Sequence, residues 1–335
     1  MSAHQVERLL RALAGAGRVT VVPHNDPDPD AIASAVALRY LVEQRLGLPV
    51  AILYSGLIGR AENKALVRYL DRPLRQLGKA DWKQAGAVAL VDSQPGAGNN
   101  PVPAGLTPAV VLDHHTWRAE TAAAAFYDVR PDAGSTSTIL TEYLQSVHLE
   151  PPAPLATALF YGIKTDTMGL ARGAGPADVA AYYYLQPLVD IDGLIEIERA
   201  QVPAVYFKSL VNAFQAARVY GDFVFSYLGP MPYPDLAAEI ADQLLRLQGV
   251  QWVLCIGVYN DNLHLAARTR NRKGGAGQFV RAIVGKMGIA GGHGSMAGGY
   301  VPLADSDPEA LAQHLGRLAL DYLKIAPDTP GQPIF

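Results

Sequence analysis

The chain contains little cysteine and few charged residues. Its 335 residues include a single cysteine, Cys255, which excludes an internal disulfide and a metal cluster built on several thiolates. Cys255 lies within the apolar run 250–258, where we expect it to be a small core residue. Only 18% of the residues are charged and 50% are hydrophobic, which argues against the disordered and coiled-coil classes. We therefore expect a compact protein of roughly two domains.

The sequence also lacks a long hydrophobic run. No stretch approaches the roughly 18 apolar residues that a membrane-spanning helix needs, and the N-terminus lacks the apolar core of a signal peptide. We therefore expect a cytoplasmic protein without a membrane partner. The formal net charge of −3 argues against a long nucleic-acid track, but it is compatible with a small, phosphate-rich ligand. The apolar composition is also compatible with a homodimer.

Short apolar runs alternate with helical patterns in the first half of the chain. Strands are predicted at 18–23, 50–54, 87–91 and 109–112, with a helix at 30–46. Strands that are apolar on both faces and separated by helices are typical of a parallel sheet covered by helices on both sides. The fold class expected is therefore α/β, with functional residues directly after the carboxyl ends of the strands.

The rest of the chain predicts a second, smaller α/β domain. Helical patterns at 134–149 and 153–165 complete the first domain, and the pattern around 187–218 is helical without a strand signal. We therefore expect a first domain at 1–190, a linker at 191–218 and a second domain at 219–335, with the active-site cleft between the domains. The elements predicted in the second domain are strands at 222–228, 250–259 and 262–269 and helices at 236–247 and 278–287.

The first predicted strand is followed at once by an imidazole and three carboxylates, those of His24, Asp26, Asp28 and Asp30. Asp28 or Asp30 would be a good N-cap for the next helix, but capping needs only one of them. The other carboxylates would repel one another without a cation. Hard divalent ions take carboxylate and imidazole ligands, so a metal site explains the whole cluster.

Polar residues also follow the later strands. Asp92 ends the third strand, Asp113, His114 and His115 end the fourth, and Asp166 ends an apolar helical segment. Each alone could be a turn former. Pooled at one sheet edge, the clusters offer about six or seven oxygen and nitrogen ligands, as two adjacent cations sharing a carboxylate require. The absence of sulfur ligands favours manganese or magnesium over structural zinc.

A second candidate site lies at 262–304, a stretch with six basic residues and no acidic one. Basic clusters are usually solvated faces and glycine runs are usually turns. Here the glycines would let backbone N–H groups approach an anion, and arginines offer forked donors for phosphate, so we expect an anion site. The candidates are Arg268, Arg270, Gly291, Gly292 and His293.

The order of these clusters resembles the DHH phosphoesterase superfamily, named for the triplet that reads Asp113-His114-His115 here. Its other signatures read His24-x3-Asp28-x-Asp30, Asp92-Ser93 and Thr165-Asp166-Thr167. The resemblance implies two divalent cations, with Mn²⁺ expected before Mg²⁺. It assigns one ion to His24, Asp28 and Asp92, and the other to Asp30, Asp92, His114 and Asp166. It further implies that His115 faces the substrate phosphate and that Asp113 orients an imidazole.

The second domain resembles the DHH-associated C-terminal domain, whose arginine and glycine-histidine loop grip the substrate. The combination implies the subgroup that hydrolyses short oligonucleotides (nanoRNA, 5′-phosphorylated dinucleotides) and 3′-phosphoadenosine 5′-phosphate by two-metal activation of water. A cyclic-dinucleotide phosphodiesterase and a pyrophosphatase-like or exopolyphosphatase-like phosphoanhydride hydrolase are alternatives on the same site. A nucleotide-binding protein without activity is another.

The sequence departs from the family pattern at four positions, although every predicted metal ligand is retained. These positions are Asp26, Pro29, Met168 and Ala290. Aromatic side chains near the second-domain loop would favour a nucleotide over inorganic pyrophosphate, but the sequence does not place Tyr300 or Phe279 there.

Overall fold

The computed structural model describes residues 3–78, 81–271, 273–326 and 328–335, which form two compact units. The first unit ends at Ala200 and the second begins at Gln201. The segment 191–218, predicted as a linker, is instead divided between the units. Its first part is helix α7 (Ile191–Glu198) of the first unit, and its second part is helix α8 (Ala204–Ala216) of the second unit. Each helix buries part of its own apolar side, which explains why neither behaves as a linker.

The first unit is built on a six-stranded parallel sheet, and the expected α/β fold is confirmed. The strands follow the order β3, β2, β1, β4, β5, β6. After β1 the chain builds one side of the sheet and then returns to add β4 on the other side of β1, so the topological switch point lies between β1 and β4. The strands are β1 (Val19–Val22), β2 (Val50–Tyr54), β3 (Leu74–Gln76), β4 (Ala87–Val91), β5 (Val110–Asp113) and β6 (Phe126–Val129).

Four of these strands match the predicted ones, whereas β3 and β6 are not predicted by the sequence pattern. Both are edge strands, and each has partly exposed residues, so neither shows the continuous apolar run of a central strand.

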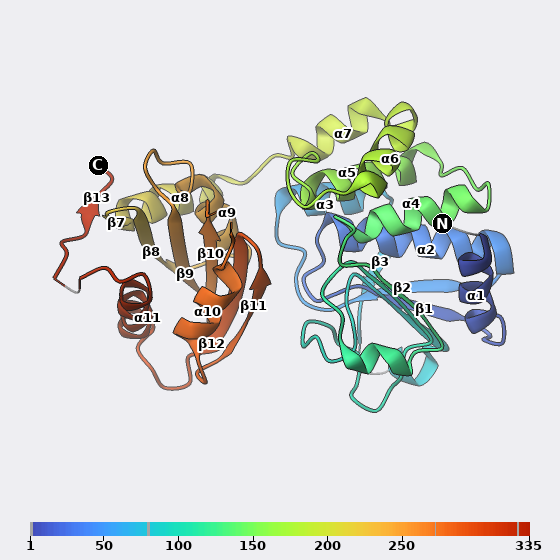
Figure 1. Cartoon of the computed structure of the whole chain (residues 1–335), viewed down its shortest axis with the longest axis horizontal. Helices are drawn as coiled ribbons and strands as arrows, with labels where there is room; N and C mark the ends of the chain where they lie inside the picture. The colour runs from blue at the N-terminus through green and yellow to red at the C-terminus, as the bar shows by residue number, and fades with distance from the viewer. Residues whose placement is uncertain (1–2, 79–80, 272, 327) are drawn as a thin grey trace. The chain divides into compact units, whose positions relative to one another are not determined.

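Helices cover one face of this sheet and form the larger core of the unit (Figure 1). Helix α2 is buried over most of its length because it packs against α4 and α5 as well as against the sheet. The opposite face is covered by short 3₁₀ helices and loops around a smaller apolar cluster. The helical elements are α1 (Ala3–Leu13), α2 (Pro29–Leu46), α3 (Ala61–Tyr69), η1 (Asp81–Gln84), η2 (Ala119–Ala123), α4 (Thr136–Ser146), α5 (Ala153–Asp166), α6 (Pro176–Leu185) and η3 (Gln186–Leu188).

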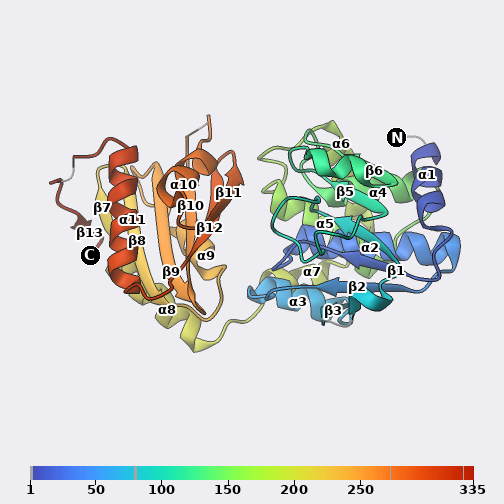
Figure 2. The same cartoon turned by 90° about the horizontal axis from the view of Figure 1, so that it is seen from below.

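The second unit is built on a mixed seven-stranded sheet in the order β11, β12, β10, β9, β8, β7, β13. Among the described strands of this second sheet, only β8 and β9 pair in parallel. Cys255 on β9 is fully buried, as predicted. Strands β11 and β13 form opposite edges of the sheet (Figure 2). The strands are β7 (Arg218–Tyr220), β8 (Phe223–Pro230), β9 (Trp252–Tyr259), β10 (Asn262–Thr269), β11 (Ile289–His293), β12 (Met296–Pro302) and β13 (Gln332–Pro333).

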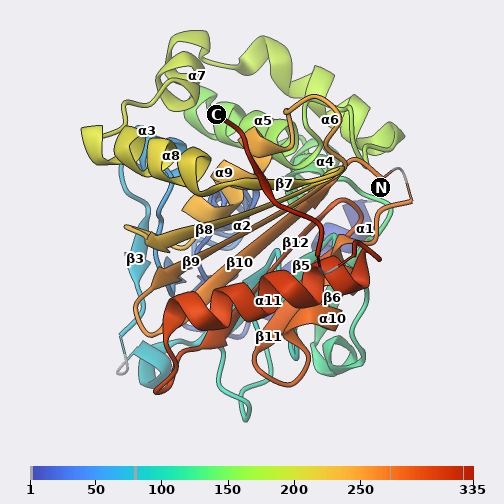
Figure 3. The same cartoon turned by 90° about the vertical axis from the view of Figure 1, so that its left-hand side faces the viewer.

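Two pairs of helices enclose this sheet. Helices α8 and α9 (Leu236–Leu244) lie on one face, and α10 (Ala276–Val284) and α11 (Pro308–Tyr322) lie on the other (Figure 3). The predicted strands of this unit correspond to β8, β9 and β10, and the predicted helices correspond to α9 and α10. Among the described residues we find no helix with the length and hydropathy needed to cross a bilayer.

Candidate metal centre

The loop after β1 places His24 and Asp28 beside the switch point of the first sheet. Asp28 is the N-cap of α2, and its Oδ1 accepts a hydrogen bond from the Ala31 N–H over 3.0 Å. The same oxygen lies 3.6 Å from His24 Nε2. His24 Nδ1 lies 2.7 Å from the Asn25 carbonyl oxygen, so an Nδ1–H tautomer directs the Nε2 lone pair toward Asp28. Asp28 therefore both caps the helix and faces an imidazole.

Asp92 follows β4 and lies between two imidazoles. Its side chain is almost fully buried, and its two oxygens lie 3.5 Å from His24 Nε2 and 3.5 Å from His114 Nε2. The Thr136 hydroxyl donates a hydrogen bond to Asp92 Oδ1 over 2.9 Å. The φ angle of Asp92 is 56°, in the left-handed region that strains a residue with a Cβ atom. The surrounding contacts hold this strained residue where its carboxylate faces both histidines.

Asp30, His114 and Asp166 come together from three separate elements. Asp166 ends α5, and its Oδ2 lies 3.4 Å from His114 Nε2. Asp30 lies in the first turn of α2, and its two oxygens accept the N–H groups of Thr136 and Ser137 at the start of α4, each over 2.7 Å. A carboxylate at a helix C-terminus is unfavourable to the helix dipole, so the position of Asp166 is better explained by a cation than by capping.

His114 shows that the residues present fit a metal ion. Its Nδ1 lies 3.3 Å from the Ala133 carbonyl oxygen, and its Nε2 is buried without a hydrogen-bond partner in the described part of the chain. An imidazole held in this way through Nδ1 is a typical metal ligand through Nε2. The facing carboxylates add hard oxygen donors, which suit Mn²⁺ or Mg²⁺.

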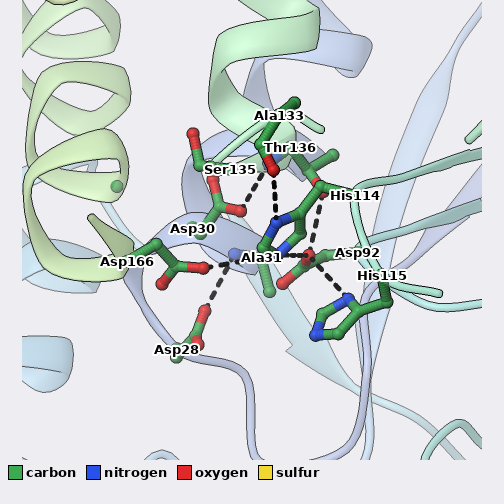
Figure 4. Close-up of polar contacts among 12 residues, drawn as sticks. Asp28, Asp30, Ala31, Asp92, His114, His115, Ala133, Ser135, Thr136 and Asp166 are labelled. Carbon is green, nitrogen blue, oxygen red and sulfur yellow. Dashed lines mark hydrogen bonds and ion pairs between the residues drawn. The ribbon is translucent and has the colours of Figure 1, made fainter. Parts of the chain in front are cut away.

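The six predicted metal ligands converge at one edge of the sheet. Figure 4 labels five of them, Asp28, Asp30, Asp92, His114 and Asp166. Ligand atoms within each of three groups lie within 4.8 Å of one another, and Asp92 belongs to two of the groups. Two groups contain residues that the resemblance assigns to the two ions, except that Asp92 is not part of the second group. The groups are His24, Asp28 and Asp92; Asp30, His114 and Asp166; and Asp92, His114 and His115.

Burial and mutual repulsion divide the carboxyl groups into two kinds. Burial, together with the charges of Asp92 and Asp28, raises the pKa of Asp30. Burial and neighbouring carboxylates likewise raise the pKa of Asp166. Burial also acts to raise the pKa of Asp92, but the neighbouring imidazoles of His24, His115 and His114 outweigh it and hold that pKa well below the ordinary value. Crowded carboxylates of this kind are stabilised when a cation neutralises them.

His115 lies at the opening of the site, with its side chain 41% exposed. Its Nδ1 is 2.8 Å from Asp113 Oδ1, the contact that an orienting role for Asp113 requires. Burial lowers the pKa of His115, but the hydrogen bond to Asp113 outweighs burial and the pKa rises to about 9. Asp113 is held in turn by Gln94, a residue that the sequence pattern does not reveal because a single glutamine in a loop forms no recognisable motif.

The two arginines predicted to bind substrate lie in different surroundings. Arg268 on β10 is only 8% exposed, and its Nε is paired with Asp242 Oδ1 of α9 over 2.5 Å. Arg270 is exposed, and its Nε donates to the Leu245 carbonyl oxygen over 2.9 Å. The two guanidinium groups therefore contact different partners in the described part of the chain. Their role in substrate binding remains a prediction.

The predicted glycine-histidine loop is part of a hairpin. Gly291 and Gly292 lie on edge strand β11, and His293 ends this strand, with its side chain outside the described part of the structure. Of the two aromatic candidates, Phe279 is fully buried in the core, whereas Tyr300 on β12 is partly exposed.

Two departures from the family pattern have a local structural explanation. Pro29 occupies the first position of α2, where a missing N–H removes no helical hydrogen bond. Ala290 lies on β11 and packs against the core of the second unit. Pro29 lies between two of the predicted ligands, Asp28 and Asp30, and both remain in the ligand groups described above.

Comparisons with known proteins agree with the fold. The model of the DHH family, N-terminal domain, matches residues 18–163. An uncharacterized protein of Methanocaldococcus jannaschii is 35% identical over 297 residues, which cover 87% of this chain and 60% of that protein. A probable manganese-dependent inorganic pyrophosphatase of Lactiplantibacillus plantarum is 32% identical over 176 residues, covering 51% of this chain and 55% of that protein.

The chain thus spans between half and two thirds of the length of these two relatives. Among solved structures, an exopolyphosphatase-related protein from Bacteroides fragilis has a similar fold. Its TM-score is 0.75 with 14% sequence identity, and the match covers 95% of this chain and 96% of that one.

Proposed function

Because residues 18–163 are a DHH family domain, we propose that this chain is a phosphohydrolase that uses two divalent cations. The observation that carries the proposal is the convergence of carboxylates and imidazoles at the β1–β4 switch point, with ligand atoms within 4.8 Å of one another in each group. Manganese is favoured because the donors are oxygen and nitrogen and because one relative is named a probable manganese-dependent enzyme.

The chain's residues divide into two ligand sets around Asp92. His24, Asp28 and Asp92 would hold one ion, and Asp30, His114 and Asp166 would hold the other, with Asp92 also facing the second site. When bound, such ions supply a water that ionises near neutral pH and positive charge for the phosphoryl oxygens. The carboxylates that support this chemistry are already oriented: Asp28 by the start of α2, and Asp30 and Asp92 by the start of α4.

His115 would bind the phosphoryl group rather than a metal. Its Nδ1 is fixed by Asp113, so that its Nε2 would donate a hydrogen bond to a phosphoryl oxygen as negative charge develops there. One histidine would thus bind a metal ion and the other the phosphoryl group, which explains why these adjacent residues lie in different surroundings. His114 is turned into the carboxylate cluster, whereas His115 stays at the opening.

We propose that the substrates are short 5′-phosphorylated oligonucleotides and 3′-phosphoadenosine 5′-phosphate. The acid-free stretch 262–304 of the second unit supports an anionic substrate. A phosphoanhydride such as inorganic pyrophosphate is the main alternative, because a relative with that name aligns with half of this chain. A cyclic dinucleotide would use the same metal-binding residues. A nucleotide-binding protein without activity is disfavoured, since every predicted metal ligand is present and reaches the site.

Hydrolysis by the purified full chain tests the proposal. The chain is incubated with Mn²⁺, or separately with Mg²⁺, and with a 5′-phosphorylated dinucleotide, 3′-phosphoadenosine 5′-phosphate, cyclic di-AMP or pyrophosphate. We expect release of a mononucleotide or phosphate from the first two substrates, no turnover in EDTA, and a loss of more than about 100-fold in Asp92→Ala.

The matched control is Asp321→Ala, which removes an exposed carboxylate on α11. It should retain wild-type rates. Turnover of none of the four substrates, or wild-type turnover by Asp92→Ala, would show that the proposal is wrong. Exclusive turnover of pyrophosphate or of cyclic di-AMP would keep the metal site and change the substrate.

A further inference from the structure

Strand register arranges one face of the second sheet in rows of residues. Strands β10, β12 and β11 are consecutive neighbours, and directly paired residues point to the same face. The first row is His264, Tyr300 and Ile289, the second is Ala266, Gly298 and Gly291, and the third begins with Arg268 and Met296. The second row therefore carries almost no side-chain volume, while the first row carries two aromatic rings.

This face is accessible on β12 and β11. Helix α10 packs on these two strands from the other side, where Ala290 and Ala297 join the core, and helix α9 packs on β9 and β10. Ile289 is 54% exposed, and Tyr300 and Gly298 are partly exposed. The rows on β12 and β11 thus form an accessible strip of sheet surface within the second unit.

The two glycines of the second row leave space that no backbone requirement explains. A Cβ atom at Gly291 would meet nothing within 4 Å, and one at Gly298 would meet only the Leu265 carbonyl oxygen, at 3.2 Å. Neither glycine has a positive φ angle, so neither is needed for an unusual backbone conformation. Glycine inside a strand weakens it and often marks a place where a ligand approaches the backbone closely.

The first row offers a stacking surface beside this space. The ring of His264 lies 6.0 Å from that of Tyr300, with 34° between the planes. Tyr259 on the next strand, β9, continues the series, with its ring 5.9 Å from that of His264. All three side chains are partly exposed. Aromatic side chains on neighbouring strands are a recurrent means of binding the bases of nucleic acids.

We propose that this surface, formed by His264, Tyr300, Gly298 and Gly291, binds the base of a nucleotide. The base would stack on Tyr300 and His264, with one edge over the glycine row. Alternate residues along a strand are roughly 7 Å apart, so the row without side chains is wide enough for a flat ring between the first and third rows. Edge strand β11 also presents unpaired backbone groups that can hydrogen-bond to a base edge.

The proposal rests on the proposed function, because a nucleotide carries both a phosphate for the proposed metal site and a flat ring that can stack on this surface. It selects among the substrates of the metal site. Inorganic pyrophosphate and polyphosphate have no ring and would gain nothing from Tyr300, whereas a nucleotide gains a stacking contact that alanine substitution in other proteins shows to be substantial.

Binding to the metal-free full chain tests this surface independently of hydrolysis. Dissociation constants of 5′-AMP and ribose 5-phosphate are measured in EDTA by isothermal titration calorimetry. We expect 5′-AMP to bind more tightly than ribose 5-phosphate, and Tyr300→Ala to raise the Kd for 5′-AMP by about fivefold or more, while Tyr300→Phe keeps it near the wild-type value. Gly291→Leu should raise the Kd similarly, because its side chain enters the open row without a clash.

Matched controls separate this site from general effects of substitution. Tyr322→Ala removes another partly exposed tyrosine, on α11, and Gly105→Leu adds the same side chain at a glycine in the first unit with open space around it. Both should bind 5′-AMP like the wild type. Equal affinity for the two ligands, absent 5′-AMP binding in the millimolar range, or unchanged affinity in both Tyr300→Ala and Gly291→Leu overturns the inference. Failure of hydrolysis with intact binding would instead count against the proposed function alone.

Discussion

Gln94 Nε2 donates a hydrogen bond to Asp113 Oδ2 over 2.7 Å, and both side chains are buried. The other oxygen of Asp113 contacts His115 Nδ1, so the three side chains form a continuous series that ends at the opening of the site. The Gln94 side-chain oxygen, Oε1, accepts hydrogen bonds from the Arg118 N–H and the Thr121 hydroxyl. The orientation of His115 therefore depends on a glutamine that does not touch the metal ligands.

Replacing this glutamine should impair turnover while sparing metal binding. In Gln94→Met, Asp113 loses a donor and His115 becomes less well oriented, so we expect kcat to fall by about 10- to 100-fold. The Mn²⁺ affinity, measured by calorimetry, should change by less than about threefold, since His24 and the ligating carboxylates are untouched. The control Gln76→Met alters an exposed glutamine on β3 and should have no effect. If Gln94→Met lost Mn²⁺ affinity as well as turnover, Gln94 would act on metal binding and not on the orientation of His115 alone.

The hydroxyl of Thr136 should tune the central carboxylate. Thr136→Val keeps the shape of the side chain and the backbone N–H that Asp30 accepts, but it removes the hydrogen bond to Asp92. We expect Mn²⁺ to bind about 10-fold more weakly, because oriented carboxylates bind metals better. Thr141→Val is the control, since its hydroxyl donates to a carbonyl oxygen within α4. Equal Mn²⁺ affinity in the two variants would show that the Thr136 contact is dispensable.

Mn²⁺ should stabilise the folded chain because it neutralises crowded carboxylates. At 100 times the Kd, binding contributes about 2.7 kcal/mol, or roughly 5–10 °C in the midpoint of thermal unfolding. Asp166→Asn should reduce that shift, and it should leave the metal-free midpoint unchanged or higher, since one repelling charge is gone. Differential scanning fluorimetry with and without EDTA measures both. A metal-free midpoint that falls well below the wild type would mean that Asp166 has a structural role instead.

The ligand residues are predictable from the sequence because apolar strands end abruptly in polar clusters. His24, Asp92 and His114 each follow a strand that is buried on both faces, and parallel strands bring their carboxyl ends to one edge. Asp28 and Asp30 follow the same strand as His24. They are predictable as ligands because capping of the next helix needs only one carboxylate.

The contacts that orient these ligands are not predictable in the same way. The bonds from Thr136 and Ser137 to Asp30 join residues more than 100 positions apart, and nothing in either segment specifies the other. The edge strands β3 and β6 are missed for a different reason. They are short and partly exposed, so their apolar patterns are too weak to define an element without the packing around them.

Cys255 should report on unfolding of the second unit. It is fully buried on β9, and burial raises the pKa of its thiol, so that the reactive thiolate is scarce and inaccessible. We expect its reaction with a disulfide reagent to be slower in the native chain than in denaturant by about 100-fold or more. Ellman's reagent measures this directly, because the chain has no other cysteine. Rapid labelling of the native chain would show that β9 opens readily.

Asp26 should stabilise the loop that carries His24 and Asp28. Its Oδ1 accepts the Leu57 N–H over 2.6 Å, its own N–H donates to the Ser55 carbonyl oxygen over 2.9 Å, and its φ angle is 54°. The contacts join the loop after β1 to the loop after β2, which gives this departure from the family pattern a structural reason. Asp26→Ala loses the side-chain hydrogen bond and keeps the strained backbone conformation, and we expect it to lower the free energy of unfolding by about 1–3 kcal/mol.

Two further variants at this position separate the hydrogen bond from the backbone strain. Asp26→Gly relieves the left-handed conformation but still lacks the acceptor, so its stability should lie between that of Asp26→Ala and the wild type. Asp26→Asn retains an acceptor oxygen and tolerates the left-handed region, so it should lie nearest the wild type. Urea denaturation followed by circular dichroism ranks the three. If Asp26→Ala is as stable as the wild type, the hydrogen bond to Leu57 contributes nothing to the stability of the loop.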